Sequence, residues 1–384
     1  MSVSFLDRQT LAAIAPTVRQ ELHITHQQFG WLGSAFAFAY LVFAPPAGRL
    51  VERWGARWVL TASVLVWSGV AMLHALAGTL LALLVLRVAL GAAEAPSFPA
   101  AATTVRAALS PAQRSTGFGL LFTGSSIGAM VAAPLAVWVA RVHGFRFAFL
   151  ATALVGLCWL PLWLVATRGE RRPEPAPAGT EAGRSLGELL GDPAMHRQIV
   201  MVATSAPAIT IVMTWFPQYL AEEGGVRKED VGHYLWLPPL AFDVAAIAFG
   251  LLASLGDARR GHRSRHRGLM LLAGALTATL ALAPLVHGPW ARVALGATCM
   301  AGGAGMYVVG TADLMRRMTA IATAGGISAA VQSLVQIVAS PIVGAVVDRT
   351  DAWWSVLVTL GLLAVPGALA WSFMPLEHRE RAVT

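Results

Sequence analysis

Long apolar segments recur along this chain and constrain its fold more than any other feature of the sequence. Each is about 20 residues long, the length that a helix needs to cross roughly 30 Å of hydrocarbon. Only 12% of the residues are charged, about half the share found in soluble domains. The sequence therefore predicts an all-α integral membrane protein with twelve membrane-spanning helices, at residues 1–18, 29–50, 58–77, 79–101, 115–140, 145–166, 197–219, 231–255, 268–287, 290–313, 321–347 and 353–374.

A hydrophilic tract divides the chain into two halves. Residues 167–196 are rich in Pro, Arg, Glu and Gly, which is typical of a solvated linker. Residues 1–166 and 197–384 are each expected to form a six-helix bundle, the second with a short tail. At one constant offset the halves share a pattern: Thr116 with Thr323, Gly119 with Gly326, Pro134 with Pro341, and Arg141 with Asp348. Such an internal duplication is common in transporters, whose binding site lies between the halves.

The basic residues indicate the orientation in the membrane. Most of the 28 Lys and Arg residues lie in every second loop or at the C-terminus, and loops rich in Lys and Arg face the cytoplasm. Both termini are therefore predicted to be cytoplasmic, in an inner membrane of the bacterial type. Because only ten uncharged residues separate Arg8 from Arg19, the first helix is expected to be short, or to begin upstream of Met1.

Two charged residues lie within the fourth predicted span. Arg87 and Glu94 are two helical turns apart, so they project from nearly the same face of a helix. A lone charge at bilayer depth costs about 2.5–3.5 kcal/mol, so such residues normally face a polar cavity or a partner. We interpret this helix as part of a transport pathway. A structural ion pair between two helices is the alternative.

Several motifs resemble one family of transporters. The turn GRLVERWGARW, residues 48–58, resembles the cytoplasmic loop signature of the major facilitator superfamily. Within that superfamily the chain is similar to the anion:cation symporter family, which includes bacterial hexuronate, galactonate and glucarate transporters. This similarity rests on FLDRQTLAAIAP (5–16), FGWLGSAFAFAY (29–40), GAAEAPSFPA (91–100) and TWFPQYL (214–220). The resemblance implies two six-helix bundles that rock about a central cavity.

The resemblance also implies roles for individual residues. Asp7 and Glu94 would be the proton-coupling sites, Arg8 and Arg87 would bind the substrate carboxylate, and Tyr40 would line the cavity. An anion that binds to an Arg changes the charge beside a neighbouring carboxyl group and thereby its affinity for a proton. This is a mechanism for symport.

The loop signature implies a latch between conformations. Its members are Gly48, Glu52, Arg53, Gly55 and Arg57, with Glu52 where the family has Asp. We expect Gly48 to allow close helix approach and Arg53 and Arg57 to hold the loop at the inner surface. A fainter copy in the second half of the chain contains Asp257.

Three further substrate-binding candidates are Ser125, Trp215 and Asp243. Ser125 stands where the family has Gln. Trp215 would line the outer side of the cavity, with an interfacial aromatic belt as the alternative. Asp243 lies within a span and would contact substrate or titrate, with a buried hydrogen-bonded acid as the alternative.

The chain departs from the family at positions that would recognise hydroxyl groups. Phe5 replaces Tyr, Ala101 and Ala102 replace an Asn pair, and Ser125 replaces Gln. A hydroxyl-binding site works through buried hydrogen bonds, so the loss of these groups leaves open a less polar carboxylate as substrate.

We therefore expect a secondary transporter that takes up an organic carboxylate, such as a hexuronate or aldonate, by proton-coupled symport with alternating access. A proton-coupled antiporter or exporter of small molecules and a transport-incompetent substrate sensor are the alternatives. No nucleotide-binding motif, metal-ligand spacing or nucleophile–base pair occurs in the sequence, so we expect no enzyme activity, metal or cofactor. A role for Na⁺ stays open. The expected partners are a small organic anion and the lipid bilayer, with no nucleic acid, and the chain is expected to act as a monomer.

Overall fold

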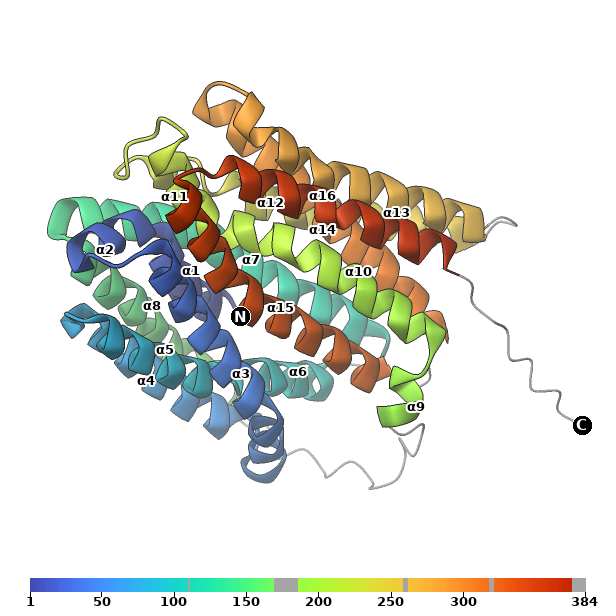
Figure 1. Cartoon of the computed structure of the whole chain (residues 1–384). Coiled ribbons are helices and arrows are strands. Elements are labelled where there is room, and N and C mark those ends of the chain that lie inside the picture. Colours follow the sequence, from blue (N-terminus) through green and yellow to red (C-terminus); the bar gives the residue numbers. More distant parts are fainter. Residues whose placement is uncertain (110, 169–185, 258–261, 318–320, 375–384) are drawn as a thin grey trace, which may run out of the picture.

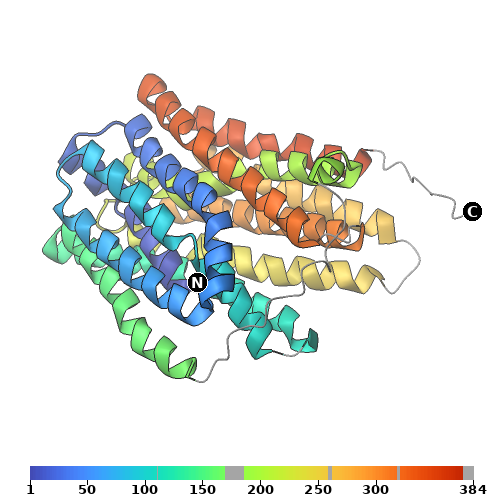
Figure 2. The ribbon, with the colours of Figure 1, turned by 90° about the horizontal axis from the view of Figure 1, so that it is seen from below.

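The computed structural model is nearly all helical (Figures 1 and 2) and describes residues 1–109, 111–168, 186–257, 262–317 and 321–374. The first half forms α1 (Ser2–Ala13), α2 (Ala15–Leu22), α3 (His26–Trp54), α4 (Ala56–Leu73), η1 (His74–Leu76), α5 (Leu80–Glu94), α6 (Ser97–Ala108), α7 (Pro111–His143) and α8 (Phe145–Ala166). The second half forms α9 (Leu186–Leu190), α10 (Pro193–Thr210), η2 (Ile211–Trp215), α11 (Phe216–Glu222), η3 (Val231–His233), α12 (Leu237–Asp257), α13 (His262–Ala278), η4 (Thr279–Leu285), α14 (Pro289–Arg317), α15 (Ile321–Thr350) and α16 (Trp354–Phe373). In both views the first-half helices, blue to green, lie mainly on one side of the molecule and the second-half helices on the other.

Eleven helical segments among the described residues are long and apolar enough to cross a membrane, one fewer than the sequence predicts. The missing one is the first predicted span, which the structure divides at Ile14 into α1 and α2. Helical hydrogen bonds still cross the division, because Ile14 N–H donates to the Thr10 carbonyl and Val18 N–H donates to the Ile14 carbonyl. Pro16 lies in the first turn of α2 and has no N–H, which explains why the helix is interrupted there.

The fourth and seventh predicted spans also contain irregular backbone. The fourth span is divided beside Glu94, where α5 ends, and Pro96 leads into α6. The seventh span passes from α10 through the π-helix η2 into α11, whose first turn contains Pro217. A proline cannot donate to the helical ladder, and a π-helical turn accommodates the change of register. Each half therefore contains a predicted span with irregular backbone.

α5 packs very closely on α3 within the first half. A Cβ atom added to Gly91 of α5 would overlap the carbonyl oxygen of Phe36 in α3. Small residues allow such approach in membranes, where helix association depends on close packing. Gly91 therefore sets the distance between the helix that carries Arg87 and Glu94 and the helix that carries Tyr40.

α3 also packs closely on α15 of the second half. A Cβ added to Gly344 would overlap the backbone of His26, and one added to Gly30 would overlap the backbone of α15. The Ser34 hydroxyl donates to the Ile337 carbonyl at 2.7 Å. The two halves are thus in backbone contact along the α3–α15 interface.

Gly91→Val is expected to lower the thermal unfolding midpoint of the purified protein in detergent, because the valine side chain would overlap Phe36. Overpacking of this kind costs about 1–3 kcal/mol. The matched control is Gly69→Val in α4, where an added Cβ would meet no atom within 4 Å, and its midpoint should stay near that of the wild type. Equal midpoints for the two variants would show that α3 and α5 do not approach so closely.

Candidate functional site

Glu94 forms a buried ion pair that joins α1 to α5. Arg8 Nε lies 2.6 Å from Glu94 Oε2, and the Ser4 hydroxyl donates to the same oxygen at 2.7 Å. The Glu94 side chain is 0% exposed, whereas the Arg8 side chain is 20% exposed. Arg8 is therefore the partly exposed member of the pair, and Glu94 is the fully buried one.

Aromatic rings surround the Arg8 guanidinium. Its Cζ lies 4.5 Å from the ring centroid of Tyr40, 4.9 Å from that of Phe36 and 5.2 Å from that of Phe5. Each such cation–π contact contributes about 0.5–1 kcal/mol at an exposed site and more where water is excluded. Because the ring faces attract the cation without neutralising it, Arg8 can exchange one carboxylate partner for another and stay in place.

Asp7 and Arg87 lie beside this pair and are both buried. The Asp7 carboxyl group faces the Thr152 hydroxyl and is close enough to Arg87 and Glu94 to interact electrostatically with both. Arg87 interacts in turn with the two acids. The site thus holds two acids and two guanidinium groups. A monoanion that enters adds one negative charge, which a single proton on either acid would cancel.

The structure brings together five residues named from the sequence: Asp7, Arg8, Tyr40, Arg87 and Glu94. Arg87 and Glu94 both face the protein interior, as the cost of exposing a charge to lipid requires. The ion-pair partner of Glu94 is, however, Arg8 on another helix. Ser4 and Thr152 join the site without having been predicted, because a lone hydroxyl residue in an apolar segment carries no signal of its own.

The remaining substrate-binding candidates lie apart from this group. The Ser125 hydroxyl points back to its own helix, 3.5 Å from the Leu121 carbonyl oxygen. Asp243 accepts a hydrogen bond from Ser126 of the other half at 2.6 Å. Among the described residues, no group of three or more His, Cys, Asp or Glu side chains could hold a metal ion.

Trp215 occupies a different environment from either one expected for it. The residue is 0% exposed, so in this conformation it neither lines an open cavity nor belongs to an interfacial belt. Its ring packs against Phe29 of the first half and Trp353 of the second, with centroid distances of 5.5 and 6.0 Å. Trp215 therefore packs where the two halves meet.

The structure describes the surroundings of three of the predicted latch residues, Arg57, Gly55 and Arg53. Arg57 donates to the carbonyl oxygens of Thr167 and Leu164 at 3.1 and 3.3 Å and so satisfies the C-terminal end of α8. Gly55 joins α3 to α4 with φ of +84°, a conformation that favours glycine. Arg53 is exposed.

The close helix approach expected at Gly48 is wrong for this conformation, because an added Cβ there would meet no atom within 4 Å. The side chains of Glu52 and Asp257 lie outside the part of the molecule that the structure describes. The latch role of the loop signature therefore stays a prediction.

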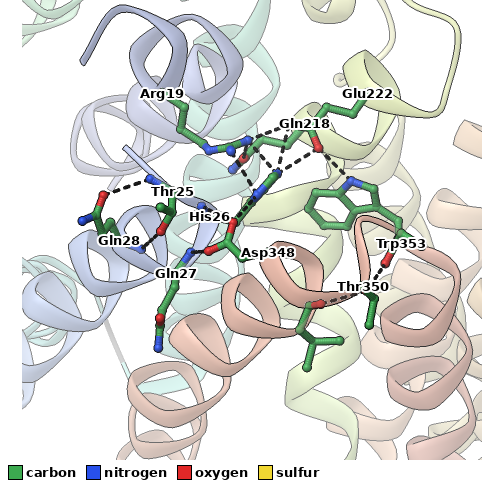
Figure 3. A network of polar contacts seen from close by, with 12 residues as sticks. Arg19, Thr25, His26, Gln27, Gln28, Gln218, Glu222, Asp348, Thr350 and Trp353 are labelled. Carbon is green, nitrogen blue, oxygen red and sulfur yellow. Dashed lines mark hydrogen bonds and ion pairs between the residues drawn. The ribbon is translucent and has the colours of Figure 1, made fainter. Parts of the chain in front are cut away.

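A polar network that sequence reasoning missed joins the two halves at the end of the molecule where α2 and α11 lie (Figure 3). We call it the closed-end network and define it as Arg19, His26, Gln218, Glu222, Asp348 and Trp353. Arg19 donates to Glu222 at 2.6 Å and to Gln218 at 3.1 Å. The Trp353 indole N–H donates to Glu222 at 2.9 Å. The cations come from the first half and the carboxylates from the second.

Asp348 caps the N-terminus of α3 from across the interface. Its two carboxylate oxygens accept from the backbone N–H groups of His26 and Gln27 at 2.9 and 2.8 Å. These N–H groups have no partner within α3, and the helix dipole favours a negative charge there. The His26 ring lies between Asp348 and Glu222, at 2.7 and 2.9 Å.

One sequence signal pointed to this end of the molecule. The internal duplication pairs Asp348 with Arg141, and both residues form ion pairs between the halves. Arg141 lies 3.7 Å from Asp230, in the loop before α12. The repeat thus places a cross-half contact at corresponding positions, although the charge is reversed.

Known proteins match nearly the whole chain. Residues 1–339 match the sequence profile of the Major Facilitator Superfamily. A hexuronate transporter of Escherichia coli (strain K12) is 27% identical over 394 residues, covering 96% of this chain and 89% of that protein. A galacturonate transporter of Dickeya chrysanthemi is 28% identical over 269 residues, covering 66% and 78%.

The fold is also known from a solved structure. The chain is similar to a bacterial homologue of the human lysosomal transporter Spinster in an inward-facing and unoccupied conformation, with a TM-score of 0.76. The match covers 97% of this chain and 91% of that one. Sequence identity is 14%, so the likeness concerns the fold alone.

Glu94→Leu is expected to destabilise the protein strongly, because it leaves Arg8 buried without its partner. Removing one member of a buried ion pair costs about 3–5 kcal/mol. The double variant Arg8→Leu/Glu94→Leu should recover much of that loss, which thermal unfolding in detergent would measure. The single variant Arg8→Leu completes the comparison. If the losses of stability in Arg8→Leu and Glu94→Leu simply add in the double variant, the two residues do not interact.

Asp348→Ala is expected to open the closed end, because it removes the cap from α3 and one partner from His26. The readout is the labelling rate of an introduced cysteine, Ala129→Cys, by a membrane-impermeant maleimide in a Cys158→Ser background. Residue 129 is 4% exposed between the halves, so labelling should be slow until the halves separate. Asp351→Ala, an exposed acid nearby, is the matched control. An unchanged labelling rate in Asp348→Ala would rule out a holding role for that carboxylate.

Proposed function

This chain belongs to the Major Facilitator Superfamily of membrane transporters, and we propose that it takes up a sugar acid by proton-coupled symport. The observation that carries this proposal is the buried Arg8–Glu94 ion pair. In that pair a carboxylate of the protein occupies the guanidinium that a substrate carboxylate would need. The relatives named for hexuronate and galacturonate support a substrate with one carboxylate and several hydroxyl groups.

Protonation of Glu94 begins the proposed cycle. A neutral Glu94 no longer attracts Arg8, so the carboxylate of the sugar acid pairs with Arg8 and with the neighbouring Arg87. The proton and the anion enter together, and the charge of the buried site stays balanced. When the substrate leaves, Glu94 loses its proton and pairs with Arg8 again. Asp7, which interacts with both Arg87 and Glu94, is the second protonatable group.

Alternating access requires that the halves separate at the closed end. Among the described residues, hydrogen bonds and ion pairs between the halves lie between the closed-end network and the Ser126–Asp243 contact. The distribution of Lys and Arg supports an orientation with the closed end outside the cell and both termini in the cytoplasm. We therefore interpret this conformation as inward-facing.

The substrate and the proton can shift this conformation only through differential binding. A ligand moves an equilibrium between two states by the difference in its affinity for them. The closed-end network stabilises the inward-facing state with contacts that the outward-facing state cannot make. To shift the equilibrium away from the inward-facing state, a ligand bound at the central site, formed by Asp7, Arg8, Tyr40, Arg87 and Glu94, must bind more tightly to states in which both halves contact it.

Acidification of the lumen of proteoliposomes on addition of a sugar acid is the expected sign of symport. D-galacturonate, D-glucuronate and D-galactonate would be added outside vesicles that contain the purified protein and a pH indicator. Wild-type protein should move protons with at least one of them. Glu94→Gln should abolish proton movement while exchange of labelled substrate persists, because the amide cannot titrate.

Glu21→Gln is the matched control for this experiment, because Glu21 is an exposed acid on α2, away from the central site. Its proton flux should equal that of the wild type. Binding of an acid without any proton or substrate flux would reject symport and favour a sensor. Proton movement that persists in Glu94→Gln would transfer the coupling role to Asp7.

A further inference from the structure

Asp243 connects the two halves within the membrane. The Ser126 hydroxyl of α7 donates to Asp243 Oδ1 of α12 at 2.6 Å. Ser126 is 9% exposed, whereas Asp243 is only half-buried. The second half thus presents a carboxylate that already accepts a hydrogen bond from an aliphatic hydroxyl and is still partly accessible.

A small cavity between the halves fixes the depth of this contact. It is lined by residues of α1, η2, α7, α11 and α12, including Gln9, Ala129 and Pro239. Apart from Gln9, its lining is apolar, with alanine, proline, valine, leucine and methionine side chains. A hydroxylated ligand therefore finds few polar partners at this level.

The next helical turn away from the closed end is different. One turn from Ala129 along α7 lies Ser126, and one turn from Pro239 along α12 lies Asp243. Along α1 the residue beside Gln9 in this direction is Arg8. Arg8 in the first half and Asp243 in the second half therefore both lie within about one helical turn of the depth of this cavity.

The charges at this depth differ between the halves. The first half supplies the guanidinium groups of Arg8 and Arg87, and the second half supplies the carboxylate of Asp243. A sugar acid has the complementary polarity. Its carboxylate is attracted to the guanidinium groups and repelled by Asp243, while its hydroxyl groups can donate to Asp243.

We propose that Asp243 is a specificity-determining residue that binds the hydroxyl groups of the substrate, and that the Ser126 hydroxyl occupies this acceptor when no substrate is bound. This inference rests on the proposed transport of a sugar acid. It adds that the Asp243 carboxylate distinguishes a hydroxylated acid from a carboxylic acid without hydroxyl groups. The corresponding first-half positions Phe5, Ala101 and Ala102 have apolar side chains that offer no acceptor for a hydroxyl group. Hydroxyl recognition is then a task of the second half.

A substrate held in this way contacts both halves. Its carboxylate binds to the first half and its hydroxyl groups bind to the second. Such a ligand has its greatest affinity for conformations in which its binding residues in the two halves are close together. Recognition of the hydroxyl groups and movement of the halves are therefore coupled through the same contacts.

The test compares two ligands in binding assays with the purified full-length protein. D-galacturonate carries a carboxylate and hydroxyl groups on a six-membered ring, and tetrahydropyran-2-carboxylate has the ring and the carboxylate alone. Asp243→Ala should weaken binding of D-galacturonate about tenfold or more, as expected for a hydrogen bond to a charged acceptor. Binding of tetrahydropyran-2-carboxylate should change less than about twofold, because that ligand has no hydroxyl group to lose.

Two further variants separate recognition from a structural role. Ser126→Ala removes the contact between the halves but leaves the Asp243 carboxylate, so the ratio of the two affinities should stay as in the wild type. Asp243→Asn retains a carbonyl acceptor and should recover part of the ratio that Asp243→Ala loses. Asp351→Ala, exposed at the closed end, controls for loss of an acid.

The outcomes distinguish this inference from the function on which it rests. Equal effects of Asp243→Ala on both ligands, matched by Ser126→Ala, would show a purely structural contact and overturn the inference, while the proposed function would stand. Failure of the wild type to bind any of D-galacturonate, D-glucuronate and D-galactonate would overturn both. A ratio that falls in Asp243→Ala and persists in Ser126→Ala would establish Asp243 as the hydroxyl-binding residue.

Discussion

The ion pair between Arg8 and Glu94 is the interaction on which the transport site depends. Hydrocarbon offers no water to solvate a charge, so each buried ionic group needs a partner. Glu94 is the ion-pair partner of Arg8, and the Ser4 hydroxyl donates to the same carboxylate oxygen. In the proposed cycle, a substrate carboxylate takes over that role when Glu94 becomes neutral. In the proposed cycle, the need to pair a buried cation is therefore what links the anion to a proton.

Polar groups also have alternative partners at the contacts between the halves. At the closed end, Arg19 and His26 of the first half pair with carboxylates of the second half, and Asp348 supplies the partners that the first N–H groups of α3 lack. Opening this end transfers these groups to water, which is an alternative partner near the membrane surface. Contacts of this kind hold a conformation firmly but can still be released, as alternating access requires.

Sequence reasoning was most successful where a single segment decides the outcome. Eleven of twelve predicted spans appear as apolar helices, because the length and hydropathy of a segment determine whether it can cross a bilayer. The first span differs because Ile14 and Pro16 interrupt it, and hydropathy does not report such local breaks. Burial of Arg87 and Glu94 also followed from one segment, since the cost of exposing a charge to lipid is independent of its neighbours.

The sequence by itself determined the membrane class, the approximate spans, the two-part organisation and the charged residues that had to be shielded from lipid. Only the tertiary structure decided which residues became partners. Glu94 pairs with a residue 86 positions away, and Asp348 caps a helix 322 positions away. Such pairings depend on the order, tilt and rotation of the helices in the bundle. These properties come from packing between segments, through contacts such as those of Gly91 and Gly344, and the apolar pattern of any one helix does not encode them.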